Sequence, residues 1–165
     1  MDSYNNDVTS QKKIGPDFLN RSSLIYIPTD QVPLYELLSN KLKLDLVTIF
    51  MIGFCIGYNS AKKLPIDNLD KNKQIRYQYL DEDARGLIYA AAIKEGLINK
   101  SDDFRKNGQV RDSVEQLMQE YTHQGIYLLN NRLTRGDVRL DQLTRIDILT
   151  TIMEYFIELQ NKVPF

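Results

Sequence analysis

The side chains that most often carry catalysis or bind metals are scarce in this chain. His123 is the single histidine and Cys55 the single cysteine, so one chain cannot supply the ligands of a usual zinc site. Cys55 lies among apolar residues, which disfavour a thiolate and argue against a Cys–His nucleophile. The sequence also lacks a Walker loop, a GxGxxG fingerprint and a G-x-S-x-G elbow. We therefore predict a protein that is not an enzyme and needs no cofactor or metal.

Carboxylates can hold magnesium without histidine or cysteine, but their spacing here indicates a structural role. Asp81, Glu82 and Asp83 are adjacent and do not converge on one point, and at a helix start they would interact favourably with the helix dipole. Glu115 and Glu120 are five residues apart and do not share a helix face. A metal-dependent nuclease is therefore the least favoured class of function.

Basic residues gather in one connection that also contains Asp67 and Asp70. With Tyr77 and Tyr79 beside it, such a segment can contact phosphates through its cations while the aromatic rings stack or pack. A solvated loop would carry the same lysines, so both interpretations stay open. The residues predicted to contact DNA are Lys62, Lys63, Lys71, Lys73 and Arg76.

An apolar run from Leu46 to Tyr58 lies before this connection. It is too short to cross a bilayer, which takes a helix of about 20 apolar residues. The run is apolar on every side, which predicts a helix buried all round, capped by Asp45. Gly53 and Gly57 would let another backbone approach closely.

Periodicity predicts four amphipathic helices around this central one. Asp30, Asp81 and Asp141 are the expected starts of three of them, with Gly96 and Gly136 as stops. Short strands are expected at residues 24–27 and 75–79. In the third and last helices, the residues expected to face inward include Leu87, Leu149, Ile152, Met153, Phe156 and Ile157.

Together these elements predict a mainly α fold, a compact five-helix domain around a buried central helix, with one or two short strands in the N-terminal half. Residues 1–20 are polar and are expected to form a flexible tail, which leaves residues 21–165 as a single domain. The composition fits a globular domain, with 42% hydrophobic residues and a formal net charge of −1. Any DNA contact must therefore be local. We see no secretory signal or membrane span and expect a cytoplasmic protein.

The order of a short strand and two helices also matches ribbon-helix-helix DNA-binding regulators, which pair the strand across a dimer. The strand here offers Leu24, Ile25, Tyr26 and Ile27, which read base edges poorly. This class is kept as an alternative.

Three segments carry a resemblance to a known family: MIGFCIGYNSAKKLPID, IRYQYLDEDARGLIYAAAIKEG and EQLMQEYTHQGIYLLNNRL. Over about residues 30–135 the chain resembles the DNA phosphorothioation-associated protein 4 family, which accompanies Dnd-type bacterial defence systems. The shared features are an apolar helix end followed by a basic turn, a middle helix, and the segment from Glu120 to Gly125. Cys55 and Ile56 depart from the small residues that are usual there.

The resemblance implies a nonenzymatic accessory subunit of an anti-phage defence complex, beside a larger ATPase, nuclease or DNA-modifying partner. In the Glu120 to Gly125 segment, we expect Tyr121 to pack inward and Gly125 to relieve crowding between helices. Glu120 and His123 are expected to face solvent or to bind the partner. A close alternative is a small adaptor subunit of an SMC-like ATPase defence complex.

Overall fold

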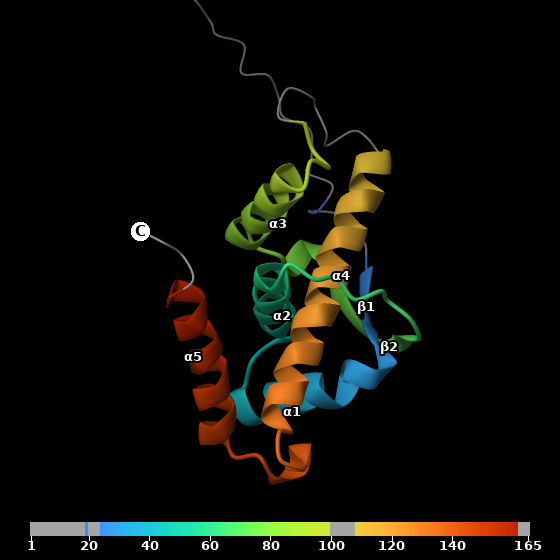
Figure 1. The fold of residues 1–165 in the computed structure, drawn as a ribbon. Coiled ribbons are helices and arrows are strands. Elements are labelled where there is room, and N and C mark those ends of the chain that lie inside the picture. Colours follow the sequence, from blue (N-terminus) through green and yellow to red (C-terminus); the bar gives the residue numbers. More distant parts are fainter. Residues whose placement is uncertain (1–18, 20–23, 100–107, 162–165) are drawn as a thin grey trace, which may run out of the picture.

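A helix of 26 residues, α4 (Gly108–Leu133), runs the length of the molecule and has its most extensive contact with the helix Leu46–Ser60 (Figure 1). The structure, a computed structural model, describes residue 19 and residues 24–99 and 108–161. These residues form the predicted mainly α domain of five helices and one small sheet. The other helices are α1 (Val32–Leu42), α2 (Leu46–Ser60), α3 (Glu82–Lys94) and α5 (Arg145–Asn161).

Glycines allow α2 and α4 to pack backbone against backbone. A Cβ atom built on Gly57 would lie 1.8 Å from the carbonyl oxygen of Tyr121, and one built on Gly125 would lie 1.8 Å from that of Gly53. Any larger residue at Gly57 or Gly125 would therefore push the two helices apart. The predicted close approach at Gly53, Gly57 and Gly125 is confirmed.

The central helix α2 begins as predicted but is not buried on every side. The Asp45 carboxylate accepts a hydrogen bond from the Thr48 N–H at 2.7 Å. Met51, Ile52 and Cys55 are half-buried, which corrects the expectation of complete burial. No single helix among the described residues is long and apolar enough to span a membrane, although the pair Thr29–Leu42 and Leu46–Ser60 reaches that length across a bend of 116°.

Two antiparallel strands, β1 (Leu24–Pro28) and β2 (Leu69–Arg76), form the sheet. Tyr26 pairs with Gln74 and Ile27 with Asp70, so residues 71–73 bulge out of the ladder. The second strand therefore lies earlier than the predicted 75–79, and residues 77–79 form a 3₁₀ turn instead. Among the described residues the ladder ends at the pair of Leu24 and Arg76, although the alternation in the sequence continues to Tyr79.

Two predicted helix starts are wrong because a 3₁₀ turn precedes each helix. Asp30 lies in the turn Thr29–Gln31, and α1 begins at Val32 without a side-chain cap. Asp141 likewise lies in a turn, and α5 begins after Thr144. Thr144 and Asp147 form a capping box, in which the Asp147 N–H donates to the Thr144 hydroxyl and the Thr144 N–H donates to the Asp147 carboxylate.

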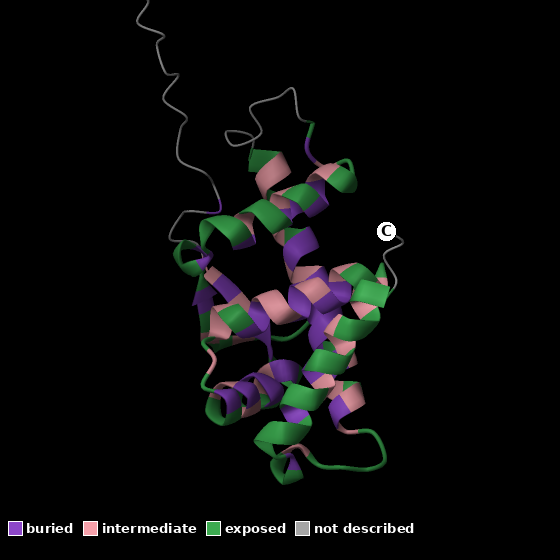
Figure 2. Cartoon of the chain, turned by 90° about the vertical axis from the view of Figure 1, so that its left-hand side faces the viewer, coloured by how far each residue is buried: buried purple, intermediate pink, exposed green. Residues whose placement is uncertain are grey.

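Buried residues gather in the middle of the fold (Figure 2). Leu19 is also fully buried, whereas the rest of the predicted tail, residues 1–20, lies outside the described residues. In α3 and α5 the apolar side chains cover more of the helix surface than the face that packs against the rest of the domain. The inward orientation predicted for the following residues is wrong, since each is exposed: Leu87, Leu149, Met153 and Ile157.

Candidate functional site

The last helix, α5, carries two apolar stripes but packs only one of them. Ile148 and Ile152 are buried against the domain. A second stripe lies about a third of a turn away, and its side chains are 41–74% exposed. We name it the α5 stripe; its members are Ile146, Leu149, Met153 and Ile157.

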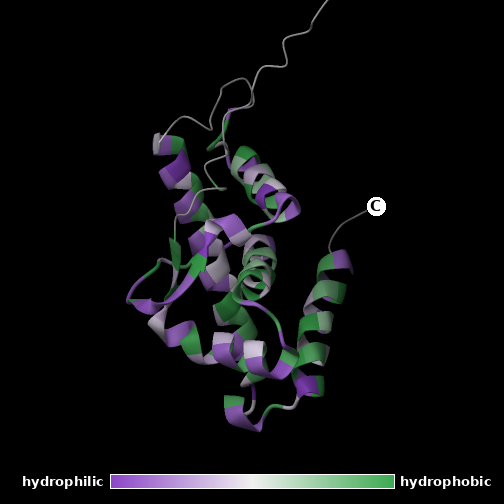
Figure 3. Cartoon of the chain, turned by 180° about the vertical axis from the view of Figure 1, so that it is seen from behind, coloured by the Kyte–Doolittle hydropathy of each residue, from purple (hydrophilic) through white to green (hydrophobic). Residues whose placement is uncertain are grey.

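The exposed position of the α5 stripe is visible in two views. In Figure 2, α5 faces the viewer and is largely exposed. Figure 3 shows that much of the same helix, which ends beside the label C, is hydrophobic. Single exposed apolar side chains are common on protein surfaces, but a contiguous apolar row along a helix marks an interaction surface.

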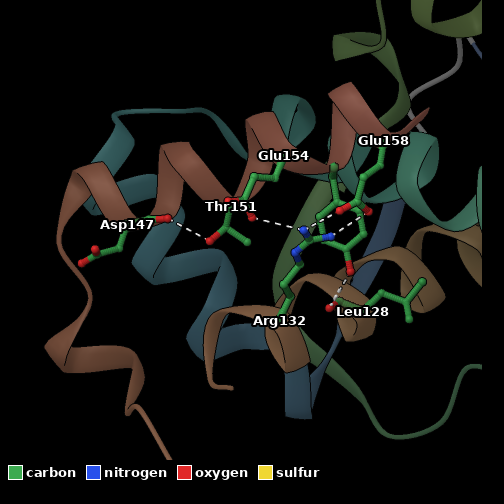
Figure 4. Close-up of polar contacts among 7 residues, drawn as sticks. Leu128, Arg132, Asp147, Thr151, Glu154 and Glu158 are labelled. Carbon is green, nitrogen blue, oxygen red and sulfur yellow. Dashed lines mark hydrogen bonds and ion pairs between the residues drawn. The ribbon is translucent and has the colours of Figure 1, made fainter. Parts of the chain in front are cut away.

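Arg132 of α4 fixes the orientation of α5. Its guanidinium donates to Glu158 at 2.7 and 2.9 Å and to Glu154 at 3.1 Å, and it lies 4.6 Å from the centre of the Tyr155 ring (Figure 4). The Tyr155 hydroxyl donates to the carbonyl oxygen of Leu128 at 3.0 Å. The hydrogen bonds to Glu158 and Glu154 raise the pKa of Arg132. The polar side of α5 is thereby held against α4, which turns the α5 stripe outward.

Replacing Arg132 with leucine should lower the free energy of unfolding by about 1–2 kcal/mol and speed amide exchange in α5. The effect should shrink at about 1 M salt, because Glu154 and Glu158 are half exposed and their charges are screened. Arg132→Lys is the matched control and should restore only part of the loss, since a lysine cannot bond two carboxylates in a fork. Unchanged exchange in α5 would show that Arg132 does not hold the helix.

A shallow groove continues the α5 stripe toward α3. It has a volume of about 290 Å³ and lies between α2, α3 and α5. Phe156 lines its α5 side, next to Met153 and Ile157 in the helix, and Leu87 lines its α3 side at 54% exposure. Cys55 of α2 also lines this groove, and burial raises the pKa of its thiol, which suits a packing role. Asp81 is the acidic residue at the edge of this groove.

The five basic residues predicted to contact DNA do not form one free cluster. Lys63 pairs at 2.9 Å with Glu95, the residue that follows α3, and Lys73 pairs with Glu36 of α1 at 2.7 Å. These pairs neutralise two of the five charges. The other three are exposed, one after α2 and two on β2: Lys62, Lys71 and Arg76.

Lys63 belongs to a polar cluster that joins α3 to α4 around Glu95. The Tyr121 hydroxyl donates to the Glu95 carboxylate at 2.6 Å, and Lys63 lies 5.2 Å from the centre of the Tyr121 ring. The hydrogen bond from Tyr121 first, and the one from Lys63 second, hold the pKa of Glu95 below its usual 4.5.

The depressed pKa of Glu95 predicts a pH-dependent stability. The folded state favours the ionised carboxylate, so the contribution of Glu95 is complete above pH 4.5 and is lost as the pH falls through the folded pKa. Glu95→Gln should therefore be less stable than the wild-type protein at about pH 7 and nearly equal to it at about pH 3. Urea unfolding at both pH values measures this. An equal deficit at both would contradict a role for the charge.

The two residues predicted to bind a partner lie in different environments. Glu120 is half-buried and accepts a hydrogen bond from Gln116 at 2.8 Å. His123 is buried at 7% exposure, so the expectation that it faces solvent is wrong. The α4 residues from Tyr121 to Ile126 are all buried, because both faces of the helix are covered there. Tyr121 does pack inward, as predicted.

Sequence reasoning missed the α5 stripe, although a signal was present. One core-facing side of a helix needs about three apolar residues in seven. The segment 145–161 exceeds that, since it carries a complete second stripe.

Comparison with family models, with curated proteins and with solved structures gives no match.

Proposed function

We propose that this chain is a nonenzymatic accessory subunit that binds a larger protein through the α5 stripe. The larger partner would be an ATPase, a nuclease or a DNA-modifying enzyme of a bacterial anti-phage defence complex in the cytoplasm. The observation that carries the binding role is the outward apolar row of α5, held in place by Arg132. The defence role rests on the sequence resemblance described above.

The stripe favours an amphipathic helix as the bound element. Its residues are spaced three, four and four apart, which is the pattern that anchors one helix along another. The 17 residues of α5 span about 25 Å, enough for several anchoring side chains. Asp81 at the edge of the groove, followed by Glu82 and Asp83, favours a partner helix with basic residues beside its apolar face.

The proposal is tested by purifying the tagged full-length chain from its native cells, expressed from its own operon. We expect a larger subunit to be recovered in a fixed ratio, and its sequence identifies its class. Recovery of an SMC-like ATPase as the larger subunit would favour the alternative in which this chain is an adaptor subunit of such a complex. Recovery of the chain alone under gentle conditions would overturn the proposal.

A direct contact with DNA is the second candidate, favoured by the exposure of Lys62, Lys71 and Arg76. Reversing these three charges should lower the affinity of the purified complex for DNA. It should also reduce the slope of log affinity against log salt concentration by up to about three. Reversing Lys63 and Lys73, which pair with carboxylates, is the comparison and should have a smaller effect. Unchanged DNA affinity after reversing the exposed three would remove this candidate.

The ribbon-helix-helix alternative is disfavoured by the pairing of β1. That class pairs its strand with the same strand of a second subunit. Here β1 pairs with β2 of its own chain, and Ile25 and Ile27 are buried. A dimer with sequence-dependent DNA affinity would restore this alternative.

A further inference from the structure

We propose that a groove beside His123 binds a guanidinium group, either from an arginine side chain or from a small free guanidine. The groove has a volume of about 710 Å³ and lies between the turn before α1, the segment after α2, and the middle of α4. Its lining residues include Asp30, Asp67, Asn68, His123 and Tyr127. The site shares no residue with the α5 stripe and does not depend on the proposed function.

A buried nitrogen without a partner points to this ligand. The Nδ1 atom of His123 lies 2.7 Å from the carbonyl oxygen of Pro65, which can only accept, so Nδ1 carries a hydrogen. In the neutral ring Nε2 then bears a lone pair. The side chain is 8% exposed, and Nε2 has no hydrogen-bond partner among the described residues. Such a group costs free energy unless a donor reaches it.

The group nearest to Nε2 is itself an acceptor. The Oδ2 atom of Asp30 lies 3.9 Å away, too far for a hydrogen bond. A donor nitrogen about 2.8 Å from each of the two atoms would satisfy both at once. Nε2 is itself buried, so a ligand in the groove reaches it only after the Asp30 carboxylate, whose side chain is 70% exposed, turns aside.

The rest of the groove favours a guanidinium over other cations. Asp67 adds a second exposed carboxylate, and the Tyr127 ring is 47% exposed. A guanidinium carries five donors in one plane and stacks on aromatic rings, so it can serve several acceptors at once. A metal ion fits less well, because among residues 24–99 and 108–161 no three His, Cys, Asp or Glu side chains are grouped to hold one.

The walls of the groove are fixed to one another before any ligand arrives. The N–H and the hydroxyl of Thr29 both donate to the carbonyl oxygen of Asn68, at 2.8 and 2.5 Å. The Gln31 amide donates to the carbonyl oxygen of His123 at 2.7 Å, and the Leu64 N–H donates to that of Glu120 at 3.3 Å. Prior ordering of this kind lowers the entropic cost of binding.

The single histidine makes the site directly observable by nitrogen NMR of the imidazole. In the free protein we expect Nδ1 to carry hydrogen, because the carbonyl oxygen of Pro65 can only accept. Titration with methylguanidinium chloride, at millimolar concentrations well below those that denature, should shift the Nε2 resonance in a saturable way. A ring with both nitrogens protonated, or an Nε2 resonance that does not move, would overturn the assignment.

Substitutions locate the bound group and its chemistry. Asp30→Asn and Asp67→Asn should each weaken methylguanidinium binding about tenfold, because each removes a charge-assisted hydrogen bond. Asp83→Asn, on the first turn of α3, is the matched control and should leave it unchanged. Methylammonium should bind more weakly, and equal binding would reject guanidinium recognition. Tighter binding of methylguanidinium than of N-acetyl-arginine amide, which carries the same single charge, would identify a small free guanidine as the ligand, and the reverse order would identify an arginine side chain.

Discussion

Replacing Gly57 with alanine should cost at least about 3 kcal/mol of the free energy of unfolding. The added Cβ would lie 1.8 Å from the carbonyl oxygen of Tyr121, and backbone atoms cannot turn aside as a flexible side chain can. The whole of α2 would have to move away from α4, opening voids along their contact. A domain of this size has a total stability of about 5–15 kcal/mol, so urea unfolding will show the loss clearly.

Gly86 supplies the matched control, because it lies within α3 and, apart from the backbone of its own helix, no atom of the described residues lies within 4 Å of a built Cβ. Gly86→Ala should raise stability by about 0.5–1 kcal/mol, since alanine loses less backbone entropy in a helix. Gly125→Ala acts on the same contact as Gly57→Ala, so the loss in the double variant should be smaller than the sum of the two. A tolerated Gly57→Ala would contradict the backbone contact.

Placing two charges on the α5 stripe should remove partner binding while leaving the fold intact. Met153→Glu combined with Ile157→Glu should weaken the affinity for the larger subunit at least about hundredfold, because each carboxylate would be buried in an apolar contact. Met153 and Ile157 are 56% and 51% exposed in the isolated chain, so the free energy of unfolding should change by no more than about 0.5 kcal/mol. Calorimetry of the complex and urea unfolding of the chain measure the two quantities.

Asn131→Glu is the matched control for this charge change. Asn131 is exposed on α4, outside the α5 stripe, and the substitution adds the same charge to a helix surface. It should leave the affinity for the partner within about threefold of wild type. Equal losses in the control and in the double variant would show that added negative charge, and not the stripe, weakens the complex.

Local signals were sufficient for several parts of the fold. Asp45 and Asp81 cap α2 and α3 as expected, because capping depends on residues only three positions apart. Gly96 ends α3 with a φ of 76°, a conformation that favours glycine. The spacing of Gly53 and Gly57 indicated a close approach in the same way, although only the structure identifies Gly125 as the opposing residue.

Tertiary context decided what the sequence left open. Leu149 and Met153 have the helical spacing of core residues, yet Ile148 and Ile152 occupy the side of α5 that faces the domain. Arg132 of α4 binds the acidic side of α5 at Glu158, and this contact sets which apolar side faces inward. His123 was expected to face solvent or a partner, but the segment after α2 covers it, and its ring contacts the carbonyl oxygen of Pro65. Neither the orientation of α5 nor the burial of His123 can be read from the neighbouring residues in the sequence.

The candidate site likewise has features that the sequence indicates and others that depend on tertiary contacts. Its basic residues were visible in the sequence, but the pairing of Lys63 with Glu95 and of Lys73 with Glu36 joins residues 32 and 37 positions apart. Only the fold shows that these charges are neutralised. The α5 stripe was visible as excess apolar surface, but its exposure depends on how α5 lies against α4.

Hydrogen exchange on the complex purified from native cells tests the central claim, that α5 is the partner-binding surface. Exchange of the backbone amides is compared between the complex and the free chain, peptide by peptide. We predict new protection in α5, residues 145–161, together with the part of α3 that contains Leu87. Protection confined to residues 62–76, with α5 exchanging as it does in the free chain, would contradict the account.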